Sequence, residues 1–420
     1  MRLTPEEEAV LRGDAGPAAS MAMRVVAAAA DLVGASCLVE ITSAHIDGCL
    51  YHGDGGVLFA ERLVEGGGRV AVPTTLNVGA LDLLRPGRVK ADEHTTAMAR
   101  RQMEAYVQLG CSPTWTCTPY HVGHRPGAGE QIAWGESNAI AFANSVLGAR
   151  TERYGDFLDA CCAVTGRAPM FGLHLEENRV ARVVVDVTGV PDALKARDEF
   201  YPVLGIWLGR AVGDAVPALV GLPETVTEDQ LKALGAAAAA SGSVALFHVV
   251  GVTPEAPTLE AATGGETDLP VMKATGQTLR EALDGLSTAA PEGDVRVDAV
   301  AVGSPHFSLE EFHRLADLLG SSALKLPFYA CTSRHVWSRV KDAGLNQALE
   351  GAGVQVVVDT CVVVTPILPR DGGILMTNSG KFARYGPSNT GFQVIYGSLE
   401  DCVATAAAGR LRRDVEMWTW

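Results

Sequence analysis

Hydrophobic positions in the last third of the chain form short runs, and amphipathic stretches separate them. The first helical stretch opens with Ser308 and Glu311, which are spaced as a capping box. Alternating strand-like and helical patterns predict a parallel sheet with right-handed crossovers. The strand-like runs lie at 295–303, 323–331 and 354–360, and the helical patterns at 308–320 and 334–353.

Polar residues follow each of these three predicted strands. Parallel strands have their carboxyl ends at one edge of the sheet, where ligands bind in open α/β folds. We therefore expect these residues to lie near one another at a ligand-binding edge. They are Ser304 and His306 after the first strand, Cys331 and Arg334 at the second, and Cys361 after the third.

The rest of the chain also alternates between helical and strand-like patterns, which predicts an α/β fold throughout. A segment rich in proline and glycine at 253–270 is the best linker candidate. We expect three regions, at 1–190, 191–265 and 266–420. Other predicted helices lie at 1–35, 90–110, 137–148 and 227–242, and other predicted strands at 37–42, 68–78 and 244–250.

Composition narrows the class of protein. The chain has 420 residues, of which 47% are hydrophobic and 20% charged, as in globular proteins. Its net charge of −15 and the lack of a Lys and Arg cluster argue against nucleic-acid binding. The start of the chain reads as a capped helix rather than a signal peptide, and no run of 18 apolar residues predicts a membrane span. We expect a cytoplasmic protein, whose nine cysteines are reduced.

Cys117, Cys331 and Cys361 differ from the other cysteines because polar, loop-forming residues surround them. For these three, metal ligation or catalysis is as plausible as packing. No CxxC or HExxH motif supports a zinc site, whereas scattered thiolates are compatible with an iron–sulfur centre. His121 and His124 near Cys117 leave a cysteine hydrolase open, although nothing else favours acyl transfer. Core packing is expected for Cys37, Cys49, Cys111, Cys161, Cys162 and Cys402.

Several cationic side chains are candidates for binding a substrate anion. Arg150 and Arg334 could clamp a carboxylate with a bidentate guanidinium, and the alternative is an ordinary surface ion pair. Lys381 lies in a polar turn at 377–387 and is expected to contact an anion. A Schiff-base or pyridoxal lysine is the alternative, but no phosphate cup or pyridinium partner is evident.

Six motifs together resemble the aconitase X family: TCTPY, AWGESNAIAFANSVLGAR, FGLHLEENR, GSPHFSLEEF, VDTC and TNSGKFARY. The similarity extends from ITSAHIDG near residue 41 to GSLEDC near residue 402. It implies an aconitase-like large part of several α/β domains with parallel sheets, lacking the small swivelling domain. A small swivelling-domain subunit, as a separate chain, is the implied partner.

The resemblance also implies an iron cofactor, either an iron–sulfur cluster (2Fe-2S or other) or mononuclear iron. Cys117 and Cys361 match the positions of its ligands. Ser304 stands at a position that is often cysteine in the family, so Cys331 is expected as the third ligand, with an oxygen or water as the alternative.

The implied activity is that of a hydro-lyase large subunit that dehydrates a small hydroxy acid. We expect the substrate to be cis-3-hydroxy-L-proline, which is converted to Δ1-pyrroline-2-carboxylate. The alternative substrate is phosphomevalonate, but no Gly-rich loop or group of basic residues that would bind its phosphate is evident. A non-catalytic iron-binding protein is the second alternative.

The expected site residues fall into two groups. The catalytic base is expected on the partner chain, with Ser43 and His45 as local alternatives, and Lys381 completes the catalytic set. The expected substrate-binding residues are Asn77, Tyr120, Glu136, Ser137, Asn138, Arg150, His174, His306 and Arg334.

Overall fold

The computed structural model describes residues 1–290, 295–369 and 372–420. The chain divides into two compact units. Unit 1 comprises Met1–Leu81 and Ala91–Val180, and unit 2 comprises Asp82–Lys90 and Ala181–Trp420.

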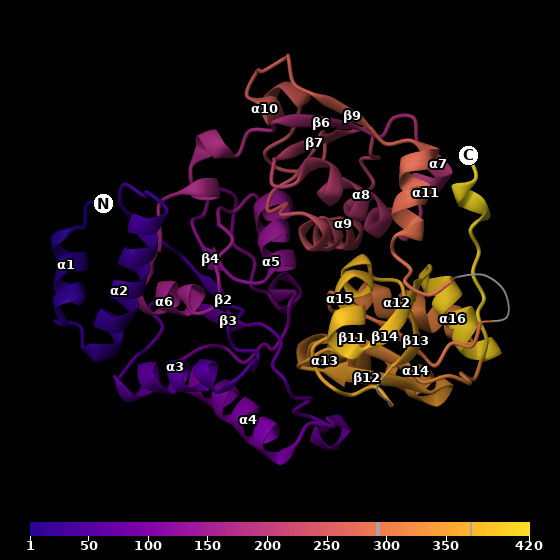
Figure 1. Cartoon of the computed structure of the whole chain (residues 1–420), viewed down its shortest axis with the longest axis horizontal. Helices are drawn as coiled ribbons and strands as arrows, with labels where there is room; N and C mark the ends of the chain where they lie inside the picture. The colour runs from indigo at the N-terminus through magenta and orange to yellow at the C-terminus, as the bar shows by residue number, and fades with distance from the viewer. Residues whose placement is uncertain (291–294, 370–371) are drawn as a thin grey trace. The chain divides into compact units, whose positions relative to one another are not determined.

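Unit 1 contains a three-stranded parallel sheet in the order β3-β2-β4 and an antiparallel pair, β1-β5. Its elements run from indigo to magenta in Figure 1. The strands are β1 (Leu38–Glu40), β2 (Ala44–Ile46), β3 (Thr74–Leu76), β4 (Ala133–Trp134) and β5 (Arg167–Pro169). The helices are α1 (Pro5–Arg12), α2 (Pro17–Leu32), α3 (Asp54–Glu65), α4 (Glu93–Gln108), α5 (Ser137–Phe142), which continues as a π-helix (Ala143–Leu147), and α6 (Leu158–Thr165).

Strand β2 lies between β3 and β4 although it precedes both in the sequence. Its central residue, His45, is level with Thr75 of β3 and Trp134 of β4. The strand predicted at 37–42 ends before this one, so the sequence pattern missed the strand at Ala44–Ile46. All three residues of β2 are buried, so the strand shows none of the polar–apolar alternation that marks a half-exposed strand.

Unit 2 contains a four-stranded parallel sheet, β8-β7-β6-β9, and a five-stranded parallel sheet, β12-β11-β10-β13-β14. The strands are β6 (Val183–Asp186), β7 (Pro217–Val220), β8 (His248–Val249), β9 (Val271–Lys273), β10 (Ala299–Val302), β11 (Phe328–Thr332), β12 (Val354–Val358), β13 (Gly373–Thr377) and β14 (Phe392–Tyr396). The helices are α7 (Asp192–Lys195), α8 (Phe200–Val212), α9 (Glu228–Ser241), α10 (Leu259–Thr263), α11 (Gly276–Asp284), α12 (Leu309–Leu319), α13 (Arg334–Asp342), α14 (Asn346–Ala352), α15 (Gly380–Thr390) and α16 (Leu399–Ala408).

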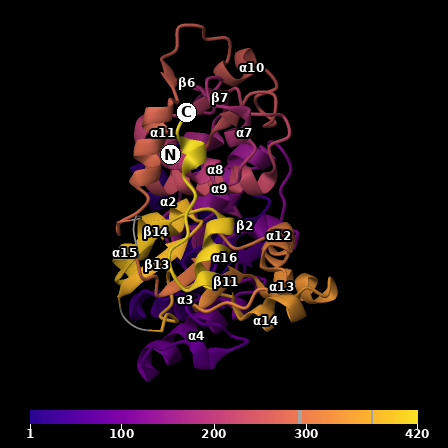
Figure 2. The same ribbon diagram turned by 90° about the vertical axis from the view of Figure 1, so that its right-hand side faces the viewer.

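The five-stranded sheet confirms the predicted parallel arrangement of β10, β11 and β12. The chain runs from β10 to β12 on one side and then returns to place β13 and β14 on the other side. The strand order reverses between β10 and β13. This reversal is a topological switch point, and open α/β sheets bind ligands at such points. Figures 1 and 2 show this sheet with α15 and α16 beside it.

Small residues let helices α8 and α9 lie very close together in unit 2. A Cβ on Gly205 would lie 2.4 Å from the carbonyl oxygen of Leu234, and one on Gly209 would lie 2.4 Å from that of Ala238. A larger side chain at either glycine would therefore push the helices apart. The run of alanines in α9, which is buried, serves the same close packing.

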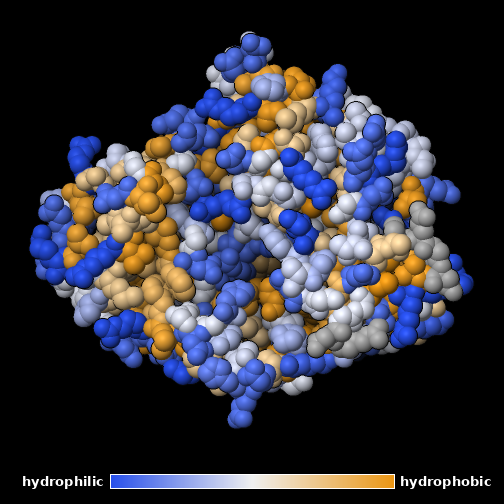
Figure 3. All heavy atoms as spheres, viewed as in Figure 1, coloured by the Kyte–Doolittle hydropathy of each residue, from blue (hydrophilic) through white to orange (hydrophobic). Residues whose placement is uncertain are grey.

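On the face shown in Figure 3, hydrophilic residues lie across the centre and along the rim, and hydrophobic residues gather mainly on the left-hand side. Within the described ranges, no helix combines the length and apolar character needed to cross a membrane.

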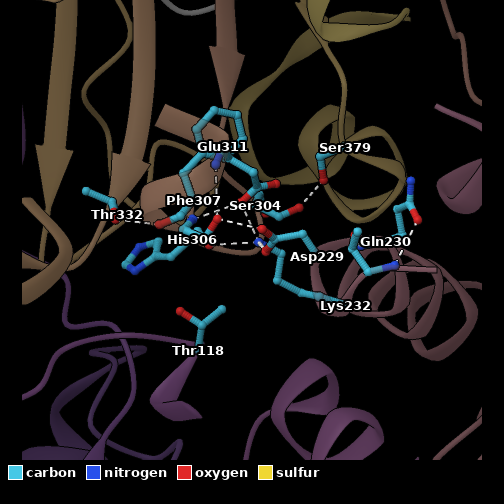
Figure 4. A network of polar contacts seen from close by, with 12 residues as sticks. Thr118, Asp229, Gln230, Lys232, Ser304, His306, Phe307, Glu311, Thr332 and Ser379 are labelled. Carbon is cyan, nitrogen blue, oxygen red and sulfur yellow. Dashed lines mark hydrogen bonds and ion pairs between the residues drawn. The ribbon is translucent and has the colours of Figure 1, made fainter. Parts of the chain in front are cut away.

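A buried lysine joins α9 to the start of α12 within unit 2 (Figure 4). Lys232 is 2% exposed, and its ammonium forms ion pairs with Asp229, at 2.7 Å, and with Glu311. Burial alone would lower the pKa of Lys232, but the two carboxylates raise it above its usual value. Ser308, whose predicted capping box with Glu311 is confirmed, also donates to Asp229 at 2.6 Å. The lysine is thus charged and compensated.

We expect Lys232→Met to lower the free energy of unfolding by about 3–5 kcal/mol at pH 7, because two carboxylates lose their buried counter-ion. Lys232 lowers the pKa of Glu311, so without the ammonium that pKa rises further in the folded state, and the loss should shrink as the pH falls and the carboxyl takes up a proton. Chemical denaturation of the wild type and the variant between pH 4 and pH 8 measures this.

Lys273→Met, at an exposed position of β9, is the matched control and should change stability by no more than about 0.5 kcal/mol. Equal losses in the two variants, or a loss at Lys232 that does not depend on pH, would show that the buried ion pairs are not the cause.

Candidate active site

In unit 1, the TCTPY loop is held by its backbone. Asn138 donates from Nδ2 to the carbonyl oxygen of Cys117, at 2.9 Å, and to the hydroxyl of Tyr120, at 3.0 Å. The ring of Tyr120 stacks on Phe142 with 3.6 Å between centroids. Cys117 itself is 8% exposed. Asn138 and Tyr120, expected to bind substrate, therefore support the cysteine loop in this structure.

The end of strand β4 leads into a strained turn. Glu136 has a φ of 69°, in the left-handed region that residues with a side chain seldom adopt. Its carboxylate caps α5 by accepting from the backbone N–H of Ala139 at 2.8 Å, and the hydroxyl of Ser137 donates to it at 3.4 Å. Such strain often marks a functional site.

The carboxyl edge of the unit 1 sheet is acidic. Asp47 follows β2, and its carboxyl accepts a hydrogen bond from the side-chain amide of Asn77, which follows β3. Burial, together with the charges of Glu136, Asp156 and Asp159, raises the pKa of Asp47 to about 7. Burial likewise raises the pKa of Asp159 to about 7, although the backbone N–H of Asp47 donates to it at 2.6 Å.

Sequence reasoning named Asn77 and Glu136 but missed Asp47 and Asp159. The place of Asp47 was a usable signal, because it follows a strand as Asn77 does. Recognising it required the short strand β2, which the hydrophobic pattern does not reveal.

The two candidate local bases lie at the unit 1 sheet. His45 is fully buried in β2, with Nδ1 2.8 Å from the hydroxyl of Thr75, and its Nε2 has no partner among the described residues. Burial lowers the pKa of His45 well below its usual value, so the ring is neutral. Ser43 is 7% exposed, and its hydroxyl also has no partner in the described part of the chain.

Arg150 and His174 are held by neighbouring side chains in unit 1. Arg150 lies 3.7 Å from the exposed carboxylate of Glu176. His174 is fully buried between Gln131, whose Oε1 is 2.6 Å from Nδ1, and the hydroxyl of Tyr154. Burial lowers the pKa of His174 to about 4, so this ring is also neutral. The structure gives His174 a packing role and leaves Arg150 partly exposed.

The loops after β10 and β13 meet at the switch point of unit 2 (Figure 4). Ser379 donates from its hydroxyl to the carbonyl oxygen of Ser304 and caps α15 by accepting from Phe382 at 2.9 Å. Lys381 follows in the first turn of α15. A small hollow, partly open to solvent, is lined by both loops and includes Ser304 and Lys381. The strand β13, missed in the sequence, brings Lys381 to this edge.

His306 connects two loops of the same edge. Its ring Nε2 lies 3.1 Å from the carbonyl oxygen of Thr360, next to Cys361, while its own carbonyl oxygen lies 3.4 Å from the ammonium of Lys232. Burial lowers the pKa of His306 to about 4. The residue therefore ties the loop after β10 to the loop after β12.

Arg334 pairs with an aspartate in this structure. Its Nε and Nη2 form a two-point contact with the carboxylate of Asp359, with Nε at 2.8 Å. Asp359 is fully buried and has a φ of 66°, so the pair holds a strained turn just before Cys361. A substrate carboxylate would have to share the guanidinium with Asp359.

The places of the cysteines bear on the implied iron. Cys361 is 7% exposed in the loop after β12, and Ser304, also 7% exposed, follows β10 of the same sheet. Cys331 is 1% exposed and lies within β11, between those two strands. Thiols in loops fit thiolate ligation of iron, and both Cys117 and Cys361 lie outside helices and strands. Across the described ranges, no three His, Cys, Asp or Glu side chains are grouped as a ready metal site.

Comparison with known proteins agrees with this architecture. Three family models match the chain in order: the aconitase X first domain over residues 1–177, the second domain over 181–284 and the third domain over 297–408. The solved structure of Thermococcus kodakaraensis aconitase X in its holo-form superposes with a TM-score of 0.85 at 35% identity, covering 97% of this chain and all of that one.

The relatives fall into two groups that are named for different substrates. A cis-3-hydroxy-L-proline dehydratase of Pseudomonas aeruginosa is 43% identical over 99% of this chain and 72% of its own length. A phosphomevalonate dehydratase large subunit of Methanocaldococcus jannaschii is 35% identical over 96% of this chain and 99% of its own length. With three domain models and near-complete relatives in agreement, this chain belongs to the aconitase X family.

Proposed function

We propose that this chain is the large subunit of a cytoplasmic hydro-lyase that converts cis-3-hydroxy-L-proline to Δ1-pyrroline-2-carboxylate. The observation that carries the proposal is the switch point of unit 2, where Lys381 follows β13 beside the loop of Ser304. The identity of 43% to the Pseudomonas dehydratase supports this substrate. Phosphomevalonate is the second candidate, since the chain matches 99% of a phosphomevalonate dehydratase large subunit.

The reaction removes the proton from C2 and hydroxide from C3, and the resulting enamine tautomerises to the pyrroline. It needs a base for the carbon-bound proton, an acid on the departing oxygen and a cation that holds the carboxylate. Lys381 supplies that cation, and its placement in the first turn of α15 adds the positive end of the helix dipole. Anchoring the carboxylate there also stabilises the charge that develops at C2.

Iron is the proposed cofactor, held by Cys117 and Cys361 with Cys331 as third ligand or Ser304 as an oxygen ligand in its place. When bound, it supplies Lewis acidity for loss of the hydroxyl. Within unit 2, the contacts of His306 with Thr360 and of Arg334 with Asp359 hold the loop that carries Cys361. His306 and Arg334 are therefore proposed to position the loop of Cys361 rather than to bind substrate.

The base is proposed to come from a small swivelling-domain subunit on a separate chain. The large-subunit names of the archaeal relatives support such a partner. Within this chain, His45 is the better local candidate, because it is neutral and its Nε2 has no partner among the described residues. Ser43 would need a second group to accept its proton.

Co-expression with a candidate small subunit should yield a complex that dehydrates cis-3-hydroxy-L-proline and leaves phosphomevalonate unchanged. Pyrroline formation, followed together with iron content, measures the outcome. Turnover of phosphomevalonate alone would reverse the substrate assignment, and an iron-loaded complex that turns over neither compound would contradict the hydro-lyase function.

Cys117→Ala and Cys361→Ala should each lose most of the bound iron, because each removes a thiolate ligand. Iron quantification and visible absorption of the purified complex measure the loss. Cys37→Ala, at a partly exposed thiol, is the control and should keep its iron. Full iron occupancy in both ligand variants would refute the assignment. Comparing Cys331→Ala with Ser304→Ala then identifies the third ligand.

A further inference from the structure

We propose that Asp47, with Asn77 and Glu136 beside it, binds the positively charged ring nitrogen of the substrate. This inference rests on the proposed function and names the group that would make the site select an amino acid. A phosphorylated hydroxy acid, which has no cationic nitrogen, would be disfavoured at the same place.

The geometry of unit 1 brings these three side chains to one edge. Asp47 follows β2 directly, Asn77 follows β3 directly, and Glu136 comes two residues after β4. The three strands are parallel, with β2 in the centre. Gly135 allows the close approach of β4, because a Cβ there would lie 2.8 Å from the Cβ of Asp47. The acidic edge is therefore built by close backbone packing.

One acceptor among these three residues is unsatisfied. Asn77 is 3% exposed, and its amide nitrogen donates to a carboxylate oxygen of Asp47. The amide oxygen of Asn77 has no partner among the residues that the structure describes. A buried polar atom without a partner is costly, and a ligand that carries a donor removes that cost. The orphaned oxygen thus indicates a missing N–H or O–H donor beside Asp47.

The local charge favours a cation as that donor. The neighbouring groups that act most on the pKa of Asp47 are Glu136, Asp156 and Asp159, all of them carboxyls that raise it. A phosphate placed among them would be repelled, whereas an ammonium would be attracted. Asp47 is also partly exposed, so a ligand can reach it.

The number of donors matches a cyclic amino acid. The secondary ammonium of a proline ring carries two N–H groups and one positive charge. One N–H can be donated to the carboxylate of Asp47 and the other to the amide oxygen of Asn77, which satisfies both acceptors. Charge-assisted hydrogen bonds of this kind are the stronger ones.

The test compares two ligands of nearly equal shape. L-Proline carries the ring ammonium, and cyclopentanecarboxylate has carbon in its place. Calorimetric titration of the iron-loaded complex should show that the wild type binds L-proline at least about tenfold more tightly. Asp47→Asn should weaken L-proline binding about 10- to 150-fold, as expected for loss of a hydrogen bond to a charged group, and leave cyclopentanecarboxylate within about threefold.

Asp156→Asn is the matched control, because its exposed carboxylate acts on Asp47 only through charge. It should change L-proline binding less than about threefold. Equal affinity of the wild type for the two ligands would overturn the proposal even if Asp47→Asn does not fold. Binding of Mg²⁺ that Asp47→Asn abolishes, with L-proline affinity unmoved, would also overturn it, since the edge would then be a metal site.

Turnover separates this inference from the proposed function. Conversion of cis-3-hydroxy-L-proline by the wild type, with a KM that Asp47→Asn leaves unchanged, would keep the function and refute the role of Asp47. Selective L-proline binding that depends on Asp47, without conversion of the hydroxylated substrate, would keep the role of Asp47 and refute the function.

Discussion

Parallel strand pairing is the constraint on which the candidate sites depend. Strands that run the same way end at the same edge, so polar residues far apart in the sequence become neighbours there. In unit 1 this brings together Asp47, Asn77 and Glu136, and in unit 2 it places Ser304 and Lys381 on either side of a switch point. The short loops that follow the strands have little freedom to place these groups elsewhere.

The two edges treat buried charge in opposite ways. Lys232 in unit 2 has two carboxylates within ion-pair distance, and these ion pairs hold α9 against the start of α12. Asp47 in unit 1 has negative neighbours, and one hydrogen bond from Asn77 offsets them only in part. A compensated charge supports the fold, whereas an uncompensated one beside an orphaned acceptor is poised for a ligand.

Several residues singled out by motif turn out to support other residues. Asn138 holds the backbone of Cys117, His306 links the loops after β10 and β12, and Arg334 pairs with Asp359. These contacts fix the loops that carry Cys117 and Cys361, the cysteines proposed to bind iron. The sequence spacing of the motif residues carries no information on which side chain faces a substrate and which faces a neighbouring loop.

The sequence by itself determined the α/β class, the parallel order of β10, β11 and β12, and the family, because long periodic patterns and extended motifs survive without coordinates. It could not locate β2, whose three buried residues show no alternation, nor bring β13 beside β10, since both depend on pairing between distant segments. Only the tertiary structure decided that Asp47 lies among like charges and that Lys232 does not. Burial and charge neighbours are properties of packing, and no local pattern in the chain encodes them.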